Sequence, residues 1–425
     1  MESKRPNTWI LTLIKTTSSL SFHGATLMDG IAEALRFLFL ELVDDIYYRN
    51  LYDVIQTEIQ LPYAHEFVWK PYKLFFKLEG APIQRVYGEA YTLDRALEFE
   101  REIMSPAEEI RKNLPTDKKN VEIGVVLIIF HSDGMMLASF GTASLWPVYM
   151  KLANWSKYPS LKTDSLAWSH ITYFPSIPPG FQDIYGEHFK AAASSKELRH
   201  VKIELLQAVW YLLLNDPPLS AFFSIDSSVI PLIMSKMMLM TMKYLSKYLC
   251  LLCLTKKCEV YQLGLKQDMT CRETKQRHDS EDLRKRVDES THLVYKRGWG
   301  VDSEAVNNKL KLGSYLRIQN TFSNLFFEHG LDYPQMFGPN ADYDTWGRIR
   351  DLLLHNMRIL IARKDKGDKK LNQRYQCMKQ LAGRDLEDIL QCALPCYEGL
   401  FIPCHDNIIQ DLLFTFATWH SYCAM

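Results

Sequence analysis

An aspartate directly after an unbroken apolar run is the first feature of this sequence that could carry chemistry. Val125–Phe130 is continuously apolar, and Ser132, Asp133 and Gly134 follow it. Such a run predicts a central strand over Val121–Ile129, covered on both faces. An acid at the end of a buried strand is the usual place for a catalytic carboxylate in an open α/β sheet, although turns also recruit Asp. Asp133 is therefore a candidate catalytic residue or a turn residue.

Two cysteines have the close spacing of a zinc-binding pair. Cys250 and Cys253 are separated by two leucines. Tetrahedral zinc needs four ligands, which Cys271 and His278 could complete. The surrounding leucines instead favour free cysteines packed in a core. A weaker metal candidate comprises Cys392, Cys396, Cys404 and His405.

A basic segment near the C-terminus is the best candidate for contacts with DNA phosphates. Residues 362–374 (ARKDKGDKKLNQR) carry six basic and two acidic side chains around Gly367. Lysine and arginine contact phosphate oxygens without reading base sequence. The alternative is a solvated loop between helices. The candidate DNA-binding residues are Arg363, Lys364, Lys366, Lys369 and Lys370.

The overall composition excludes a disordered, collagen-like or low-complexity chain. Hydrophobic residues make up 47% of the 425 residues, which is ordinary for a globular chain. Fifty basic side chains balance fifty acidic ones, so DNA contacts must come from a local patch. The nine cysteines are an odd set and all lie in the second half, which favours reduced thiols. Lysines interrupt the most apolar stretch, so we expect a nuclear or cytoplasmic protein without a membrane span.

Several helices and one return strand are predicted around these residues. Ser194–Leu214 has a helical apolar stripe and the Ser194–Glu197 spacing of a capping box. Met135–Phe140 could form a second strand after the turn. Cys271–Arg297 is a charged helical stretch whose interleaved signs indicate a solvated face. Further helices are predicted at Asp29–Val43, Lys379–Leu390 and Ile408–His420.

Long motifs in this chain resemble transposases of the Kyakuja-Dileera-Zisupton superfamily, Plavaka lineage, which fungal DNA transposons encode. The first motif is RVYGEAYT at Arg85–Thr92, and the second is VVLIIFHSDGMMLASFGTASLWPVYMKLANWS at Val125–Ser156. The resemblance then continues through His170–Pro178, Glu204–Asn215 and Leu263–Thr270, and it closes with Lys379–His420.

The resemblance implies an α/β fold: a ribonuclease-H-like mixed sheet with a helical insertion and a mostly helical C-terminal third. Such cores hold two Mg²⁺ ions on acidic residues and use them to cleave and join DNA strands. By motif position, Asp133 is the first metal-binding carboxylate. The implied domains are an unassigned region at 1–84, the core at 85–260, the insertion at 261–335 and the C-terminal region at 336–425.

The chain departs from the family pattern where further acids are expected. The acidic stretch that should precede the cysteine pair is absent from Asp226–Met242, and a strand near residues 224–236 could be lost with it. Farther on, the expected Pro-Asp is Pro339-Asn340, and an uncharged Asn cannot replace a carboxylate. The chain ends at Met425, where relatives continue. Asp226, Asp342 and Asp344 are the possible substitutes.

We therefore expect a truncated, degraded, transposon-derived protein that resembles a DDE-type transposase and is catalytically inactive on its own. Its expected partner is the DNA of transposon ends, and Mg²⁺ is its cofactor if it is active. One alternative is an active transposase with substitute acids. The other is a helical interaction scaffold without a nucleic-acid role.

Overall fold

The computed structural model describes most of the first three quarters of the chain and one C-terminal helix. The described residues are 46–101, 124–136, 144–215, 229–232, 247–329, 332–336 and 403–424, apart from isolated positions that include Asp133. The chain divides into two compact units, 1–338 and 339–425, and each is described by itself. The predicted helices Asp29–Val43 and Lys379–Leu390 lie outside the described residues.

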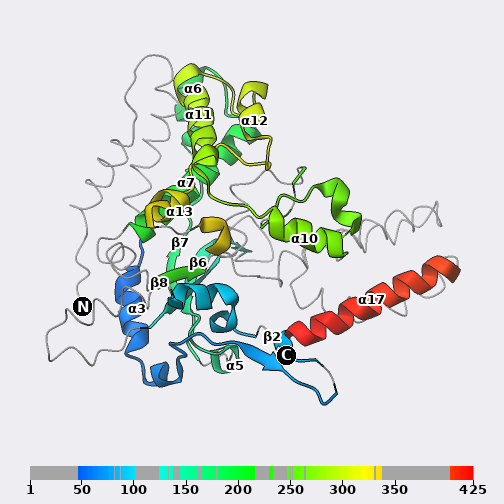
Figure 1. Cartoon of the computed structure of the whole chain (residues 1–425). Coiled ribbons are helices and arrows are strands. Elements are labelled where there is room, and N and C mark those ends of the chain that lie inside the picture. The colour runs from blue at the N-terminus through cyan, green and yellow to red at the C-terminus, as the bar shows by residue number, and fades with distance from the viewer. Residues whose placement is uncertain are drawn as a thin grey trace, which may run out of the picture. The chain divides into compact units, whose positions relative to one another are not determined.

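A four-stranded mixed sheet is the centre of the first unit (Figure 1). Its strands are β3 (Val126–Ser132), β6 (Pro147–Leu152), β7 (Ser169–Tyr173) and β8 (Val229–Leu232). They lie in the order β7-β6-β3-β8. The β7–β6 and β6–β3 pairs are antiparallel, whereas β3 and β8 are parallel. The stretch in which a strand could have been lost therefore contributes the fourth strand.

The central strand overlaps the predicted range Val121–Ile129, but among the described residues it begins at Val126 and continues to Ser132. Val126, Leu127, Ile128 and Phe130 are buried, and only Ile129 and His131 are partly exposed. The first return strand differs from the prediction. Of Met135–Phe140, the described part Met135–Met136 forms β4, which pairs with β5 (Ser144–Leu145) and not with β3. The antiparallel partner of β3 is β6, so a small separate ribbon lies between the two strands in the sequence.

The long helix α7 (Ser195–Leu214) covers one face of this sheet. The predicted capping box is confirmed, because Ser194 and Glu197 satisfy each other's backbone N–H groups. Trp210 of α7 is fully buried and contacts Phe130 of β3 edge-on, with ring centroids 5.0 Å apart. Large aromatic rings that pack in this way contribute strongly to core energetics. The helix and the central strand therefore share one hydrophobic core.

Short elements complete the sheet side of this unit. The helices are α3 (Leu51–Ile59), α5 (Lys157–Ser160) and α6 (Phe181–Phe189). A two-stranded hairpin pairs β1 (Leu74–Phe76) with β2 (Gln84–Val86). Single 3-10 turns are η1 (Pro62–Glu66) and η2 (Ala90–Thr92). Leu51, Val54 and Ile55 on one side of α3 join the core, as their helical spacing favours.

The remainder of the unit is helical. It contains α10 (Lys266–Thr274), α11 (Glu281–Arg297), α12 (Glu304–Leu310) and α13 (Thr321–Phe326), with 3-10 turns η4 (Lys257–Gln262), η5 (Phe327–His329) and η6 (Tyr333–Met336). The charged stretch Cys271–Arg297 is thus two helices and not one. The break contains Ser280, whose side chain accepts from the Leu283 N–H and so starts α11.

The described part of the second unit is the helix α17 (Pro403–Ala424). It includes the predicted helix Ile408–His420 and extends beyond it in both directions. Among the described helices, none is both long enough and apolar enough to cross a membrane.

Candidate functional site

The edge of the sheet at which β3 ends is the candidate functional site. Ser132 is the last residue of β3, is 5% exposed and pairs with Val148 of β6. Its hydroxyl Oγ has no hydrogen-bond partner among the described residues. Asp133 follows immediately in the sequence and lies outside the described residues. The strand therefore carries the chain to this edge directly before the predicted carboxylate.

Neighbouring strands bring aromatic and basic side chains to the same edge. Pro147, the first residue of β6, pairs with Tyr173, the last residue of β7. Trp146 precedes β6 and packs edge-on against Phe174, with ring centroids 5.4 Å apart. The ammonium of Lys202, on α7, lies 4.9 Å from the centre of the Trp146 ring. A positive charge on an aromatic face of this kind is favourable.

A buried asparagine fixes the start of the central strand. Asn154 is 1% exposed, and its Nδ2 donates to the carbonyls of Val125 (2.7 Å) and Val68 (2.9 Å). Its Oδ1 accepts from the Leu127 N–H at 2.8 Å. The amide therefore satisfies backbone groups from two segments that are far apart in the sequence. Buried backbone groups need such partners, so Asn154 holds β3 in its position.

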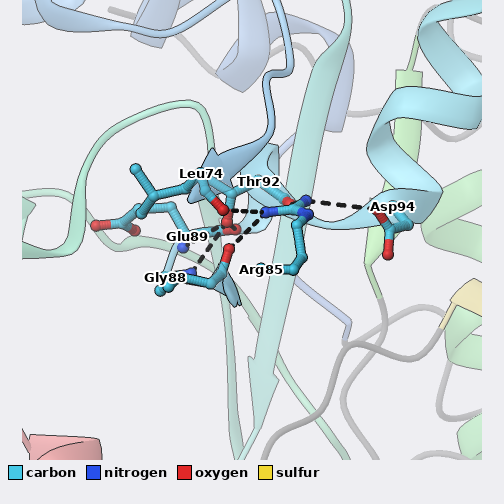
Figure 2. A network of polar contacts seen from close by, with 7 residues as sticks. Leu74, Arg85, Gly88, Glu89, Thr92 and Asp94 are labelled. Carbon is cyan, nitrogen blue, oxygen red and sulfur yellow. Dashed lines mark hydrogen bonds and ion pairs between the residues drawn. The ribbon is translucent and has the colours of Figure 1, made fainter. Parts of the chain in front are cut away.

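The first resemblance motif is a turn closed by its own arginine (Figure 2). The Arg85 guanidinium donates to the carbonyls of Leu74 (3.0 Å), Val86 and Thr92, and it pairs with Asp94 at 3.4 Å. Thr92 Oγ1 accepts from the Gly88 and Glu89 N–H groups at 3.0 and 3.1 Å. Arginine is well suited to this position because its planar guanidinium group can donate several hydrogen bonds at once.

This turn also contacts the end of the second motif. The Glu89 carboxylate accepts from Ser156 Oγ at 3.0 Å and from the Lys157 N–H at 3.1 Å. The two motifs that carry the resemblance are therefore in direct contact, although about seventy residues separate Glu89 from Ser156. Their role in the described residues is to build and brace the sheet.

The sheet face that points away from α7 carries partly exposed polar side chains together with the buried Lys151. His131 of β3 and Tyr149 of β6 are paired residues, and Tyr149 is paired with His170 of β7. On the same strand as Tyr149, Lys151 lies with its ammonium 5.8 Å from the centre of the Trp168 ring. Burial lowers the pKa of Lys151 below the usual range for lysine. Histidine and lysine on one face are candidate proton-transfer or anion-binding groups.

A buried ionisable network joins α7 to α11, and no sequence motif predicted it. His200 Nε2 lies 2.7 Å from the Tyr295 hydroxyl, which also bonds to Glu204. Burial, helped by the nearby positive charge of Arg317, lowers the pKa of His200 to about 3. Burial raises the pKa of Glu204 to about 7 against the opposing effect of Arg317. Such a contact between residues far apart in the sequence leaves no local signal.

The cysteine pair is brought together, but with an arginine beside it. Arg272 Nη1 lies 3.7 Å from Cys253 Sγ and 4.0 Å from Cys250 Sγ. A hydrogen bond joins the two thiols, and Thr255 Oγ1 lies 3.2 Å from Cys253 Sγ. The hydrogen bond from Cys250 lowers the pKa of Cys253 to about 5. These contacts favour negative charge on Cys253. The hydrogen bond with Cys253, together with burial, raises the pKa of Cys250, so the pair carries one thiolate and one thiol.

The described residues around this pair do not fit a tetrahedral zinc ion. His278, a predicted ligand, pairs through Nδ1 with Asp332 at 2.8 Å. Within the described ranges, no three His, Cys, Asp or Glu residues form a group able to hold a metal ion. A permanently charged guanidinium against the sulfurs also opposes a second cation there. In the weaker metal group, Cys392 and Cys396 lie outside the described residues, and Cys404 is exposed on α17.

Most of the other predicted site residues fall outside the described part of the chain. This holds for the candidate acids Asp133, Asp226, Asp342 and Asp344 and for the basic residues Arg363, Lys364, Lys366, Lys369 and Lys370. Their catalytic, metal-binding and DNA-binding roles stay predictions.

Comparison with known families gives a match over the sheet region. Residues 41–209 match the family model of the Plavaka transposase. This segment is Plavaka-like. The match begins upstream of Arg85, where the first motif starts, and it includes β3, β6, β7 and most of α7. It covers less than half of the 425 residues, and among curated proteins none matches the sequence.

The Plavaka match confirms the predicted resemblance over this segment. Asp133 lies inside the matched residues. Asp226, the cysteine pair and the basic segment all lie outside them. The matched segment thus contributes three of the four strands of the sheet and the first candidate acid, whereas β8 lies outside it.

Proposed function

We propose that this chain is a transposon-derived protein with a ribonuclease-H-like core that does not cut DNA by itself. The strand order supports the proposed core. A ribonuclease-H-like sheet has three antiparallel strands, then a helix, then a fourth strand parallel to the first. β3, β6, β7, α7 and β8 follow one another in this way along the chain. The match of residues 41–209 to the Plavaka transposase supports the origin from a transposon.

The lack of an acid directly after β8 in the sequence is the observation that carries the proposed inactivity. Because β3 and β8 are parallel, they end at the same edge of the sheet. An acid supplied by the end of β8 would therefore follow Leu232, the last residue of that strand. The sequence contains no Asp or Glu from there until Glu259. Glu259 accepts from the Lys256 N–H at 3.1 Å and closes a local turn.

Asp226 does not meet this requirement, and Asp342 and Asp344 do not follow β8 directly in the sequence. Asp226 precedes β8 in the sequence, whereas β8 begins at the edge opposite to the end of β3. Asp342 and Asp344 come more than one hundred residues after β8. Two Mg²⁺ ions, which supply the activated oxygen and neutralise the leaving group, need several converging carboxylates. The one predicted acid, Asp133, does not provide that donor set.

A nicking assay on supercoiled plasmid tests the proposal. The purified full-length chain is incubated with plasmid and Mg²⁺ or Mn²⁺ beside an Asp133→Asn variant. We expect no nicking above the level of the variant. Metal-dependent nicking that Asp133→Asn abolishes would overturn the proposal and favour an active transposase with substitute acids. Nicking that the variant retains would instead indicate a contaminating nuclease, which a further purification step removes before the comparison is repeated.

DNA binding without cleavage is the retained activity that we propose. Transposases bind DNA in general, and the basic residues Arg363–Lys370 are the predicted phosphate contacts. Affinity for a DNA duplex should fall steeply as salt increases, because phosphate contacts release counterions. A chain that fails to bind DNA even at low salt would be a helical interaction scaffold instead.

A further inference from the structure

The cysteine pair Cys250 and Cys253 is the strongest unassigned cluster in the described residues. It lies outside the Plavaka-matching segment, and the proposed DNA binding does not use it. Its surroundings also do not fit the zinc ion that the two-residue spacing predicted. The pair therefore consists of two thiols beside an arginine, and no role described above uses them.

Backbone hydrogen bonds hold the pair in a defined position. Cys253 forms an antiparallel bridge with Gln276, and the Leu254 N–H donates to the Lys275 carbonyl at 2.8 Å. The buried Arg277 donates through Nε to the Cys250 carbonyl at 2.9 Å. Both cysteines are thus fixed against the segment that follows α10, and their side chains share one environment.

Arg277 is itself locked in place, which strengthens this framework. Its Nη1 donates to the Gly313 carbonyl at 2.8 Å, and its guanidinium lies 4.9 Å from the centre of the Tyr315 ring. Gly313 has a φ of +98°, and a Cβ atom there would lie 2.4 Å from the Tyr315 ring. Only glycine fits at this position.

A second arginine supplies the charge that the sulfurs face. Arg272 is anchored through Nε to Asp268 at 2.7 Å, and Asp268 is 3% exposed. This ion pair aims Nη1 at both sulfur atoms. A fixed positive charge next to a thiol favours the thiolate, which is the nucleophilic form. Cys250 is partly exposed and Cys253 is buried, so small solutes reach the pair from the side of Cys250.

We propose that Cys250 and Cys253 are a redox-active dithiol that hydrogen peroxide oxidises to an intramolecular disulfide and that a thiol reductant returns to two thiols. The thiolate of the pair attacks one oxygen of the peroxide, the O–O bond breaks, and the departing oxygen leaves as water after taking a proton. The resulting sulfenic acid is attacked by the second thiol, an S–S bond forms, and a second water leaves with that thiol's proton. Two thiols are oxidised and one peroxide is reduced to two waters.

The trypsin cleavage sites around the pair make a direct test possible. Trypsin cleaves after Lys247 and Lys256, so residues Tyr248–Lys256 form one peptide with both cysteines and no other. The full-length chain is treated with hydrogen peroxide, blocked with an alkylating reagent, digested and measured by mass spectrometry. We expect this peptide to lose the mass of two hydrogen atoms and to escape alkylation. Treatment with a thiol reductant before blocking should restore two alkylated cysteines.

Cysteine and arginine variants, together with a measurement of bound zinc, distinguish a redox-active dithiol from a zinc site. Cys253→Ser should abolish the mass loss, whereas Cys258→Ser, at an exposed cysteine outside the pair, should leave it unchanged. Arg272→Gln should slow disulfide formation several-fold, and Arg272→Lys, which keeps the charge, should restore part of the rate. Peroxide that leaves both thiols free, or stoichiometric zinc that Cys253→Ser releases from the untreated chain, would overturn the proposal.

Discussion

Single buried polar side chains explain how the sheet is held together. The Asn154 side chain forms hydrogen bonds with three backbone groups. Replacing it by an apolar residue would leave these groups buried without hydrogen-bond partners. An exposed asparagine has water as a substitute partner and contributes far less.

Asn154→Ala is therefore expected to lower the free energy of unfolding by about 2–4 kcal/mol, because buried backbone groups lose their hydrogen bonds. Urea denaturation followed by circular dichroism measures the change. Asn324→Ala, at an exposed position on α13, is the matched control and should change stability by less than about 0.5 kcal/mol. Equal effects of the two substitutions would contradict the role of Asn154.

The network at the α7–α11 contact predicts a pH dependence of stability. The groups that face Glu204 are His200, Tyr295 and Arg317. Because the folded-state pKa of Glu204 is raised to about 7, its contribution to stability is complete below the ordinary pKa of 4.5 and is lost as pH rises through 7. The lowered pKa of His200 acts oppositely, so that its contribution is lost as pH falls below 6.5.

Glu204→Gln removes the pH dependence of stability that comes from Glu204 and leaves the one that comes from His200 in place. The melting temperature of the variant should equal or exceed that of the unmodified chain. The difference should grow as pH rises from about 5 to about 8, because the raised pKa of the Glu204 carboxyl makes its ionisation costly in this range. Melting curves across these pH values provide the measurement. A difference that shrinks as pH increases would show that Glu204 is stabilised as a carboxylate by Arg317.

At the scale of elements, the turn at Arg85–Thr92 braces the sheet from outside. Glu89 bridges this turn to the residues that follow β6 and start α5. The hairpin β1–β2 contributes to the same contact, because Arg85 lies on β2 and bonds to the Leu74 carbonyl on β1.

Glu89→Ala should release this contact without unfolding the core. We expect faster hydrogen exchange at the Lys157 amide, which loses its acceptor, and in the 85–92 turn, measured by mass spectrometry. The central strand β3 should keep its protection. Glu98→Ala, which removes a carboxylate paired with the nearby Arg95 in a surface contact, is the control and should leave the Lys157 amide unchanged. Unchanged exchange in Glu89→Ala would contradict the bracing role.

At the scale of the whole molecule, zero net charge means that DNA binding depends on a local patch. Neutralising the basic segment should therefore weaken binding in a salt-dependent way. The variant carries Gln at five positions: Arg363, Lys364, Lys366, Lys369 and Lys370. The slope of log affinity against log salt should become shallower by about 0.9 for each phosphate that the variant no longer neutralises, as measured by fluorescence anisotropy.

A control with the same change in charge separates the patch from general electrostatics. It carries Gln at five exposed lysines elsewhere: Lys162, Lys257, Lys266, Lys285 and Lys311. This control should retain most of the affinity and the salt slope. An equal weakening of binding in both variants would show that the basic segment is not a specific contact surface.

The features that depend on neighbours in the sequence were predictable without a structure. The apolar run of β3 and the Ser194–Glu197 cap of α7 act within a few residues, so their patterns carry the information locally. The Plavaka resemblance is also a property of contiguous motifs, and it holds over residues 41–209. The break between α10 and α11 was missed because helical propensity continues through a short capped turn.

Contacts between residues far apart in the sequence could be identified only from the tertiary structure. The parallel placement of β8 beside β3, the Glu89–Ser156 contact, the His200–Tyr295 pair and the position of Arg272 against two thiols each join separate segments. Linear spacing specifies which side chains share an element, but the path of the backbone sets which elements meet. For this reason the cysteine spacing that suggested zinc was ambiguous, whereas the arginine beside the sulfurs points to thiol chemistry.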